Sequence, residues 1–207
     1  MNRAVRWGAP LVIGVLSLLH PLPAAGDVAG SLTPVLVRWQ AVHIFQLVAF
    51  PMVALAAYRL SPSGAATERS VARIAFSVFA VSAAAYDSLA GLGTGSAVAI
   101  AGQDPQRMAF VQDYFTHRVV EPTFWIVYAG TAIGWLVGIG AVALGIWRSG
   151  TSRAAVALLV PAAALSIDHI PPFGVVAALS LLGATWLVTV GGKQTAPLAG
   201  RPRAARG

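Results

Sequence analysis

The sequence predicts an all-α membrane protein, a single transmembrane domain over residues 1–207 built as a six-helix bundle with both termini in the cytoplasm. Of the 207 residues, 57% are hydrophobic and only 10% are charged, and the mean hydropathy is +0.74. Soluble domains average about 25% charged residues, so this chain could not bury its apolar surface in water. The composition excludes a soluble enzyme and also a disordered chain, which would be polar.

Six apolar segments are each long enough to cross the bilayer as a helix of about 20 residues. They are residues 7–25, 37–58, 72–96, 122–147, 151–169 and 172–191. Pro171 and Pro172 separate the last two, because proline lacks a backbone donor and restricts the residue before it. The outer stretch 106–119 carries apolar residues at helical spacing, namely Met108, Val111, Tyr114 and Phe115. It could lie in the membrane interface as an amphipathic helix that covers the site as a lid, but a plain connecting helix is the favoured interpretation.

The basic residues fix the orientation of these segments. With the N-terminus in the cytoplasm, 11 of the 14 lysines and arginines fall in cytoplasmic segments, as the positive-inside rule requires. Residues 193–207 then form a basic, disordered cytoplasmic tail. The same asymmetry explains the net charge of +7 without a nucleic-acid partner. The expected partners are the lipid bilayer and either a second copy or another membrane protein, in the cytoplasmic membrane of a bacterium.

A signal peptide is the alternative interpretation of the first span. Arg3 and Arg6 make a basic start, and the small residues at 24–26 resemble a cleavage site. Cleavage after residue 26 would leave five spans and an external N-terminus. His20 and Pro21 are unusual within the apolar part of a signal peptide, so an uncleaved first span is favoured.

Glycines at four-residue spacing predict close helix packing. Gly130, Gly134 and Gly138 lie on one face of the fourth span, where another backbone can approach closely. Gly91 and Gly95 repeat the pattern in the third span. The segment 91–95 has no preceding strand and no suitable lysine, so it is not a phosphate-binding loop.

Ionisable and polar residues gather in one outer layer of the predicted bundle when each helical residue is given a rise of about 1.5 Å. Intramembrane ionisable groups are costly and are functional candidates by default. Trp39, predicted to lie in the interfacial aromatic belt, shares one helix face with His43, Gln46 and Phe50. We expect an outward-facing polar cavity lined by His43, Gln46 and Asp87. Its candidate neighbours are His20, Glu121, Asp168 and His169.

This layer has the ligands for a zinc site. His43, Asp87 and His169 with one water would satisfy a catalytic zinc ion, although no helix carries a paired metal-binding motif. Membrane hydrolases of the alkaline ceramidase type assemble such a site from several helices, and the similarity here is one of architecture without shared motifs. The sequence contains no cysteine, which excludes thiolate sites.

Three other uses of the layer remain open. Aspartate and histidine can relay protons or cations in a transporter, and His20 with His43 could ligate a haem. In an accessory subunit the same residues would form an internal hydrogen-bond network. The favoured function is to bind or transport a small solute or lipid, or to serve a partner. A metal-dependent, membrane-embedded hydrolase acting on a lipid is the alternative.

The chain resembles a group of small polytopic integral membrane proteins of bacteria, common in high-GC actinobacteria. The resemblance covers most of the membrane region. It rests on Leu19-His20-Pro21, on His43 with Gln46, on the segment Tyr86-Asp87-Ser88-Leu89-Ala90-Gly91-Leu92-Gly93-Thr94-Gly95, and on His169-Ile170-Pro171-Pro172-Phe173-Gly174. The group has no established activity, so the resemblance implies a membrane location and a fold but no reaction.

Overall fold

The computed structural model describes residues 3–24, 26–118 and 122–194, and the regular elements within these ranges are helices. The elements are α1 (Arg3–Leu19), α2 (Val28–Leu32), η1 (Thr33–Val35), α3 (Leu36–Tyr58), α4 (Ala66–Tyr86), the π-helical η2 (Asp87–Gly93), α5 (Thr94–Ala101), α6 (Pro105–Arg118), α7 (Pro122–Ser149), α8 (Arg153–Ala162), η3 (Ala163–Ser166) and α9 (Phe173–Gln194). The predicted all-helical class is confirmed.

Within the described residues, four helical segments are long and apolar enough to cross a membrane, as a membrane-embedded protein requires. They are Val28–Tyr58, Ala66–Ala101, Pro122–Ser149 and Phe173–Val190. The first and fifth predicted spans correspond to α1 and to the shorter apolar segment Arg153–Ser166.

Several boundaries differ from the prediction, and α1 already ends at Leu19, before the predicted end of the first span at residue 25. Helical structure continues from Ala66 to Ala101 through η2, so it runs past the predicted end of the third span at residue 96. Helix α9 continues to Gln194 and therefore includes the first two residues of the predicted tail 193–207. The rest of that tail lies outside the described residues.

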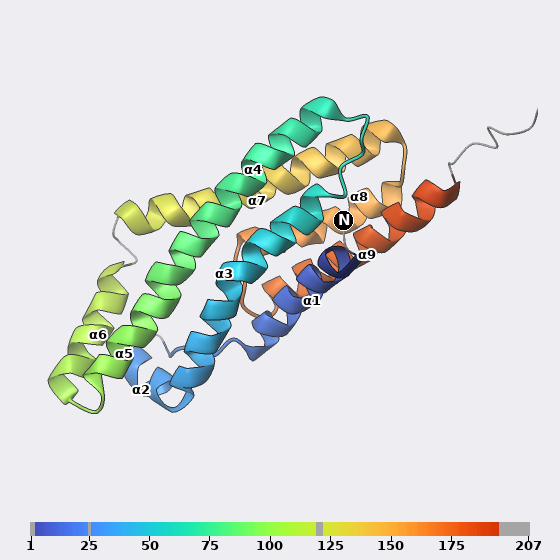
Figure 1. Cartoon of the computed structure of the whole chain (residues 1–207). Helices are drawn as coiled ribbons and strands as arrows, with labels where there is room; N and C mark the ends of the chain where they lie inside the picture. The colour runs from blue at the N-terminus through green and yellow to red at the C-terminus, as the bar shows by residue number, and fades with distance from the viewer. Residues whose placement is uncertain (1–2, 25, 119–121, 195–207) are drawn as a thin grey trace, which may run out of the picture.

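Six helices form a closed ring of neighbours around one apolar core. Each contacts the next in the order α1, α3, α4, α7, α8 and α9, and α9 returns to α1 (Figure 1). The core is filled by large buried side chains such as Phe79, Trp135, Ile146 and Leu181. The ring matters for function because it brings α1, near the N-terminus, against α9, near the C-terminus.

The seam between α4 and α7 depends on the predicted glycines. A Cβ atom on Gly134 would lie 2.6 Å from the backbone nitrogen of Phe79 and 2.8 Å from the carbonyl oxygen of Ala75. A Cβ on Gly138 would meet the ring of Phe76. The prediction that these glycines allow close helix approach is confirmed, and the seam holds α4 in the position from which Asp87 enters the site.

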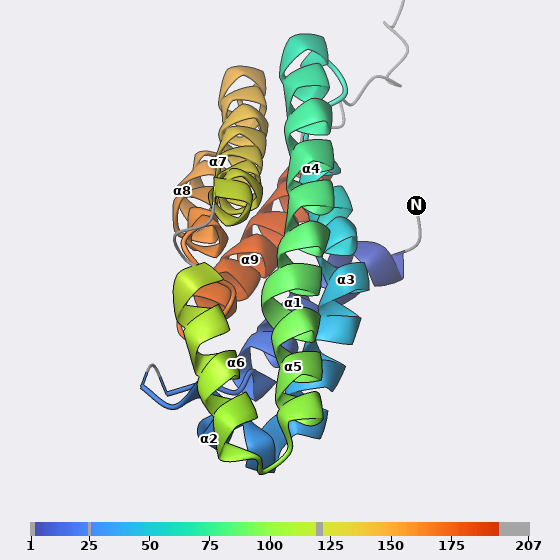
Figure 2. The same ribbon diagram turned by 90° about the vertical axis from the view of Figure 1, so that its left-hand side faces the viewer.

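A small helical cap closes one end of the ring. Helices α2, α5 and α6 gather there, away from α8 and the end of α9 (Figures 1 and 2). Val28, Leu32 and Val111 form its apolar centre together with Trp39 of α3, and the backbone nitrogen of Val28 donates to Gln112 Oε1 at 2.8 Å. The predicted connecting helix at 106–119 corresponds to α6, which the structure describes up to Arg118.

Candidate metal centre

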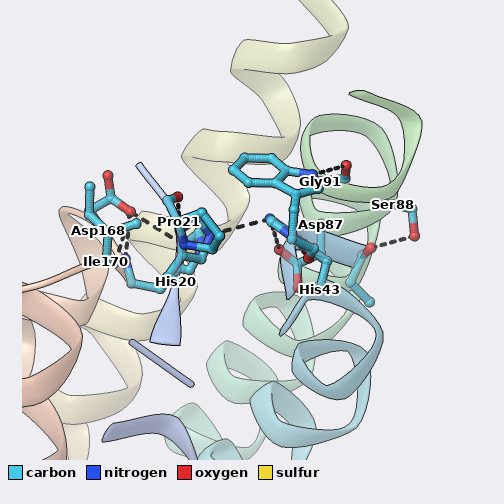
Figure 3. Close-up of polar contacts among 11 residues, drawn as sticks. His20, Pro21, His43, Asp87, Ser88, Gly91, Asp168 and Ile170 are labelled. Carbon is cyan, nitrogen blue, oxygen red and sulfur yellow. Dashed lines mark hydrogen bonds and ion pairs between the residues drawn. The ribbon is translucent and has the colours of Figure 1, made fainter. Parts of the chain in front are cut away.

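Three histidines from distant parts of the chain meet where the ring joins the cap. His20 follows α1 and His43 lies in α3 (Figure 3). His169 lies between η3 and α9. One ring nitrogen from each lies within 4.8 Å of the other two. The Nε2 atoms of His20 and His43 are 3.3 Å apart. The three side chains therefore form a cluster that could hold a metal ion.

Backbone carbonyls orient two of the three rings. His43 donates its Nδ1 hydrogen to the carbonyl oxygen of Trp39, four residues earlier on α3, at 2.8 Å. His20 donates its Nδ1 hydrogen to the carbonyl oxygen of Pro21 at 2.7 Å. A neutral imidazole with hydrogen on Nδ1 carries a lone pair on Nε2. The two facing Nε2 atoms are thus both electron-pair donors.

The third ring is arranged in the same way, with Nδ1 next to an oxygen atom and Nε2 without a hydrogen-bond partner. His169 Nδ1 lies 3.3 Å from Asp168 Oδ1, while its Nε2 is buried and has no hydrogen-bond partner. Neutral imidazole is the form that binds metals. A hydrogen bond from Nδ1 to an oxygen is the usual outer support of a metal-bound histidine.

A carboxylate stands next to the cluster. Asp87, the first residue of η2, has no exposed surface, and neither of its oxygens has a hydrogen-bond partner. Its Oδ1 atom lies 4.0 Å from His43 Nε2. A carboxylate left unpaired in a protein interior is costly, so the arrangement favours a positively charged occupant between Asp87 and the imidazoles.

The π-helical segment presses directly against His43. A Cβ atom on Gly91 would lie 2.6 Å from His43 Nε2, so only glycine leaves room for this ring. Trp39 donates its indole hydrogen to the carbonyl oxygen of Gly91 at 2.7 Å and is 4% exposed. The prediction that Trp39 belongs to an interfacial belt is wrong, because the cap covers it and it supports His43. Single π-helical turns are rare and often occur at functional sites.

A cavity of about 30 Å³ adjoins the cluster. Space of this size holds one or a few water molecules. His169 and Asp168 form its polar edge, and its other walls are mainly apolar or aromatic, among them Phe50, Phe79, Tyr86 and Tyr128. His43, Gln46 and Asp87, the expected lining of a polar cavity, are not part of its wall.

The remaining predicted site residues lie outside the histidine cluster, each in a different position. Gln46 is buried one turn along α3 from His43, and its Oε1 atom has no hydrogen-bond partner. Asp168 Oδ1 accepts the backbone hydrogen of His169 at 2.6 Å and so shapes the turn that presents this histidine. Glu121 lies outside the described residues. The expected shared face on α3 is confirmed, since Trp39, His43, Gln46 and Phe50 are all buried.

His20 is the residue whose role the sequence underestimated. The expected metal set was His43, Asp87 and His169, with His20 only a neighbour, whereas His20 is a full member of the cluster. The available signal was a histidine at the end of an apolar helix, fixed by the proline that follows it. The rings of His20 and His43 touch with centroids 4.9 Å apart, which leaves no room for a haem between them.

No known protein family, no curated protein and no solved structure matches this chain. The case for its function therefore depends on the chemistry of the histidine cluster and its surroundings.

Proposed function

We propose that this protein is a membrane-embedded, zinc-dependent hydrolase in which His20, His43 and His169 hold the metal ion. The observation that carries the proposal is the distance of 3.3 Å between the Nε2 atoms of His20 and His43. Tetrahedral zinc with Zn–N bonds of 2.0–2.1 Å spaces two ligand nitrogens by about 3.3 Å. The two side chains thus already have the separation of zinc ligands.

A metal ion would provide partners for more of the polar atoms in this site than a shared proton would. A proton shared by His20 and His43 would satisfy only the two facing nitrogens. It would leave His169 Nε2 and both Asp87 oxygens without hydrogen-bond partners in the interior. A divalent cation bound by three neutral imidazoles accepts the third nitrogen as well and offers Asp87 a compensating charge.

Three protein ligands leave one coordination position for water, which is the pattern of catalytic zinc. Zinc lowers the pKa of a bound water to about 7 and so supplies a nucleophile at neutral pH. The carboxylate of Asp87, 4.0 Å from His43 Nε2, is placed to accept the proton of that water. His169 also borders the aromatic cavity of about 30 Å³, which has room for the attacking water.

The packing beyond the cluster favours hydrolysis over transport. Beyond His169, towards the end of the ring opposite the cap, the ring of Phe79 contacts the rings of Phe50 and Trp135. Each of these three side chains is at most 4% exposed. Val53, one turn beyond Phe50, is fully buried as well. A solute path through the bundle would have to displace these large side chains, whereas a hydrolase needs access from one side only.

The topology that accompanies this proposal has six spans and cytoplasmic termini in a bacterial cytoplasmic membrane. Arg59, Arg69 and Arg148 gather at the end of the ring opposite the cap, together with Arg73 and Arg153, while the cap helix α6 contains Arg107 and Arg118. This asymmetry supports a cytoplasmic location for the first group. The cluster then lies in the outer part of the membrane, and a lipid substrate reaches it from the outer leaflet.

Metal analysis of the detergent-purified protein tests the site. We expect about one zinc ion per chain after incubation with Zn²⁺ and removal of the excess. The His20→Ala, His43→Ala and His169→Ala variants should each lose most of it. His117→Ala is the matched control, because His117 is exposed on α6, far from the cluster in sequence and paired with Asp113. Zinc-free wild-type protein, or equal zinc in all four variants, would refute the site.

A second measurement tests hydrolysis separately. The zinc-loaded protein in vesicles should cleave fluorogenic lipid esters or amides, and Asp87→Asn should keep its zinc but lose at least about 100-fold in turnover, the usual contribution of a general base. A folded, zinc-loaded protein without activity on either substrate type would remove the hydrolase and leave a metal-binding membrane protein.

A further inference from the structure

At the end of the ring opposite the cap, a groove separates α3 from α4 and has a volume of about 300 Å³. Small residues face each other across it: Pro51 and Ala54 on α3, and Ser77 and Ala80 on α4. These short side chains do not fill the space between the helices, and Ser77 is exposed. The result is an apolar channel on the outside of the bundle, remote from the histidine cluster.

One end of this groove is strongly basic. Tyr58 and Arg73 line it there. The guanidinium carbons of Arg59 and Arg69 lie 5.9 Å and 5.4 Å from the centre of the Tyr58 ring, and Arg69 also donates to the carbonyl oxygen of Ser61 at 3.2 Å. Two guanidinium groups thus flank Tyr58, and Arg73, one turn along α4 from Arg69, supplies a third to the lining of the groove.

No described carboxylate neutralises this charge. Glu68, the acid on the first turn of α4, forms its ion pair with Arg148 of α7 instead. Across residues 3–24, 26–118 and 122–194, no ion pair involves Arg59, Arg69 or Arg73. The groove therefore ends in a concentration of positive charge that is available to an external anion.

We infer that this groove binds one anionic phospholipid of the cytoplasmic leaflet. Its phosphate would pair with Arg73 and the neighbouring guanidinium groups, which form strong charge-assisted hydrogen bonds to phosphate. One acyl chain would lie along the groove from Tyr58 to Pro51, seven residues and about 10 Å along α3. Basic pockets between membrane helices on the cytoplasmic side bind anionic headgroups in this way.

The occupant is a lipid rather than a free phosphate because the apolar channel continues from the basic end into the membrane zone. The inference is independent of the metal site, since the groove residues and the cluster residues do not overlap. It assigns a second lipid contact, distinct from the proposed substrate, that would anchor α3 against α4 at the cytoplasmic surface.

Native mass spectrometry with added lipids tests the inference. The wild-type protein should retain one phosphatidylglycerol molecule at concentrations where phosphatidylcholine is lost. Arg73→Gln should reduce the phosphatidylglycerol adduct about 5- to 10-fold, as expected for one phosphate contact near the surface. Ser77→Leu, which fills the groove from an exposed position, should reduce it by a similar factor.

Arg38→Gln is the matched control, because Arg38 is exposed near the opposite end of α3. It should leave phosphatidylglycerol binding unchanged. Equal retention of phosphatidylcholine and phosphatidylglycerol would overturn the inference. So would an equal loss in Arg38→Gln and Arg73→Gln, or full binding in Ser77→Leu. Thermal unfolding of each variant confirms that it is folded before its lipid adducts are compared.

Discussion

Replacing Gly91 with alanine should push the His43 ring out of the metal site. The new Cβ would overlap Cδ2 and Cγ of the His43 ring and lie 2.6 Å from its Nε2, whereas non-bonded heavy atoms need about 3.5 Å. The ring must therefore retreat by at least about 1 Å. The ring is tied to α3 by its hydrogen bond to the Trp39 carbonyl oxygen, so it cannot retreat without losing its orientation.

The size of the effect follows from this displacement. Metal–ligand distances tolerate deviations of about 0.2 Å, and loss of an outer supporting contact alone costs about 10- to 100-fold in metal affinity. A ligand moved by about 1 Å belongs at the upper end of that range, so we expect about a 100-fold weaker zinc affinity, or about 2.7 kcal/mol. Global stability should change less, because overpacking costs about 1–3 kcal/mol while alanine regains about 0.5–1 kcal/mol over glycine in a helix.

Competition with a chromophoric chelator measures the zinc affinity of Gly91→Ala in detergent. Gly93→Ala is the control within the same π-helical segment, because its Cβ would meet only the carbonyl oxygen of Ser88, at 3.3 Å. It should bind zinc within a factor of about three of wild type, the ordinary scatter of a contact that can relax. Unchanged affinity in Gly91→Ala, or equal weakening in both variants, would refute the assignment of His43 as a ligand.

Three further predictions concern stability in detergent. Zinc at about 100 times its dissociation constant should raise the unfolding temperature by about 5–10 °C, and a chelator should reverse it; the same rise with Mg²⁺ would contradict a nitrogen-ligand site. Gly134→Ala should cost about 1–3 kcal/mol because its Cβ meets the backbone of α4, whereas Gly140→Ala, with open space around its Cβ, should not destabilise. Trp39→Phe should cost about 1–3 kcal/mol, since the buried carbonyl of Gly91 loses its indole donor; an unfolding temperature equal to that of wild type would show that the hydrogen bond is unimportant.

The sequence predicted the helices and their packing faces better than the site. The face shared by His43, Gln46 and Phe50 and the glycine seam at Gly134 follow from the helical repeat, which depends only on local spacing. The third span was predicted to end at residue 96, whereas the helix continues through the π-helical segment and its two glycines to Ala101. Glycine usually weakens a helix, and only packing against α3 accounts for its continuation here.

The metal cluster could be predicted only in part. Depth along each helix placed His20, His43 and His169 in one layer, since a helix rises by a fixed amount per residue. Depth does not say which side chains turn towards one another. The expected set therefore included Asp87 and left out His20, which enters the cluster because Pro21 and the end of α1 direct its ring towards α3.

By itself, the sequence determined that this chain has the composition of a membrane protein. It also determined that its helices pack through faces that carry glycine, and that its ionisable groups lie at a similar depth. These properties are fixed by composition and by the helical repeat, which are local. The tertiary structure decided that three imidazoles meet, each with a ring nitrogen within 4.8 Å of the others, beside a buried carboxylate that has no hydrogen-bond partner. That arrangement depends on the closed ring, in which α1 packs between α3 and α9 and brings His20 to histidines 23 and 149 residues away.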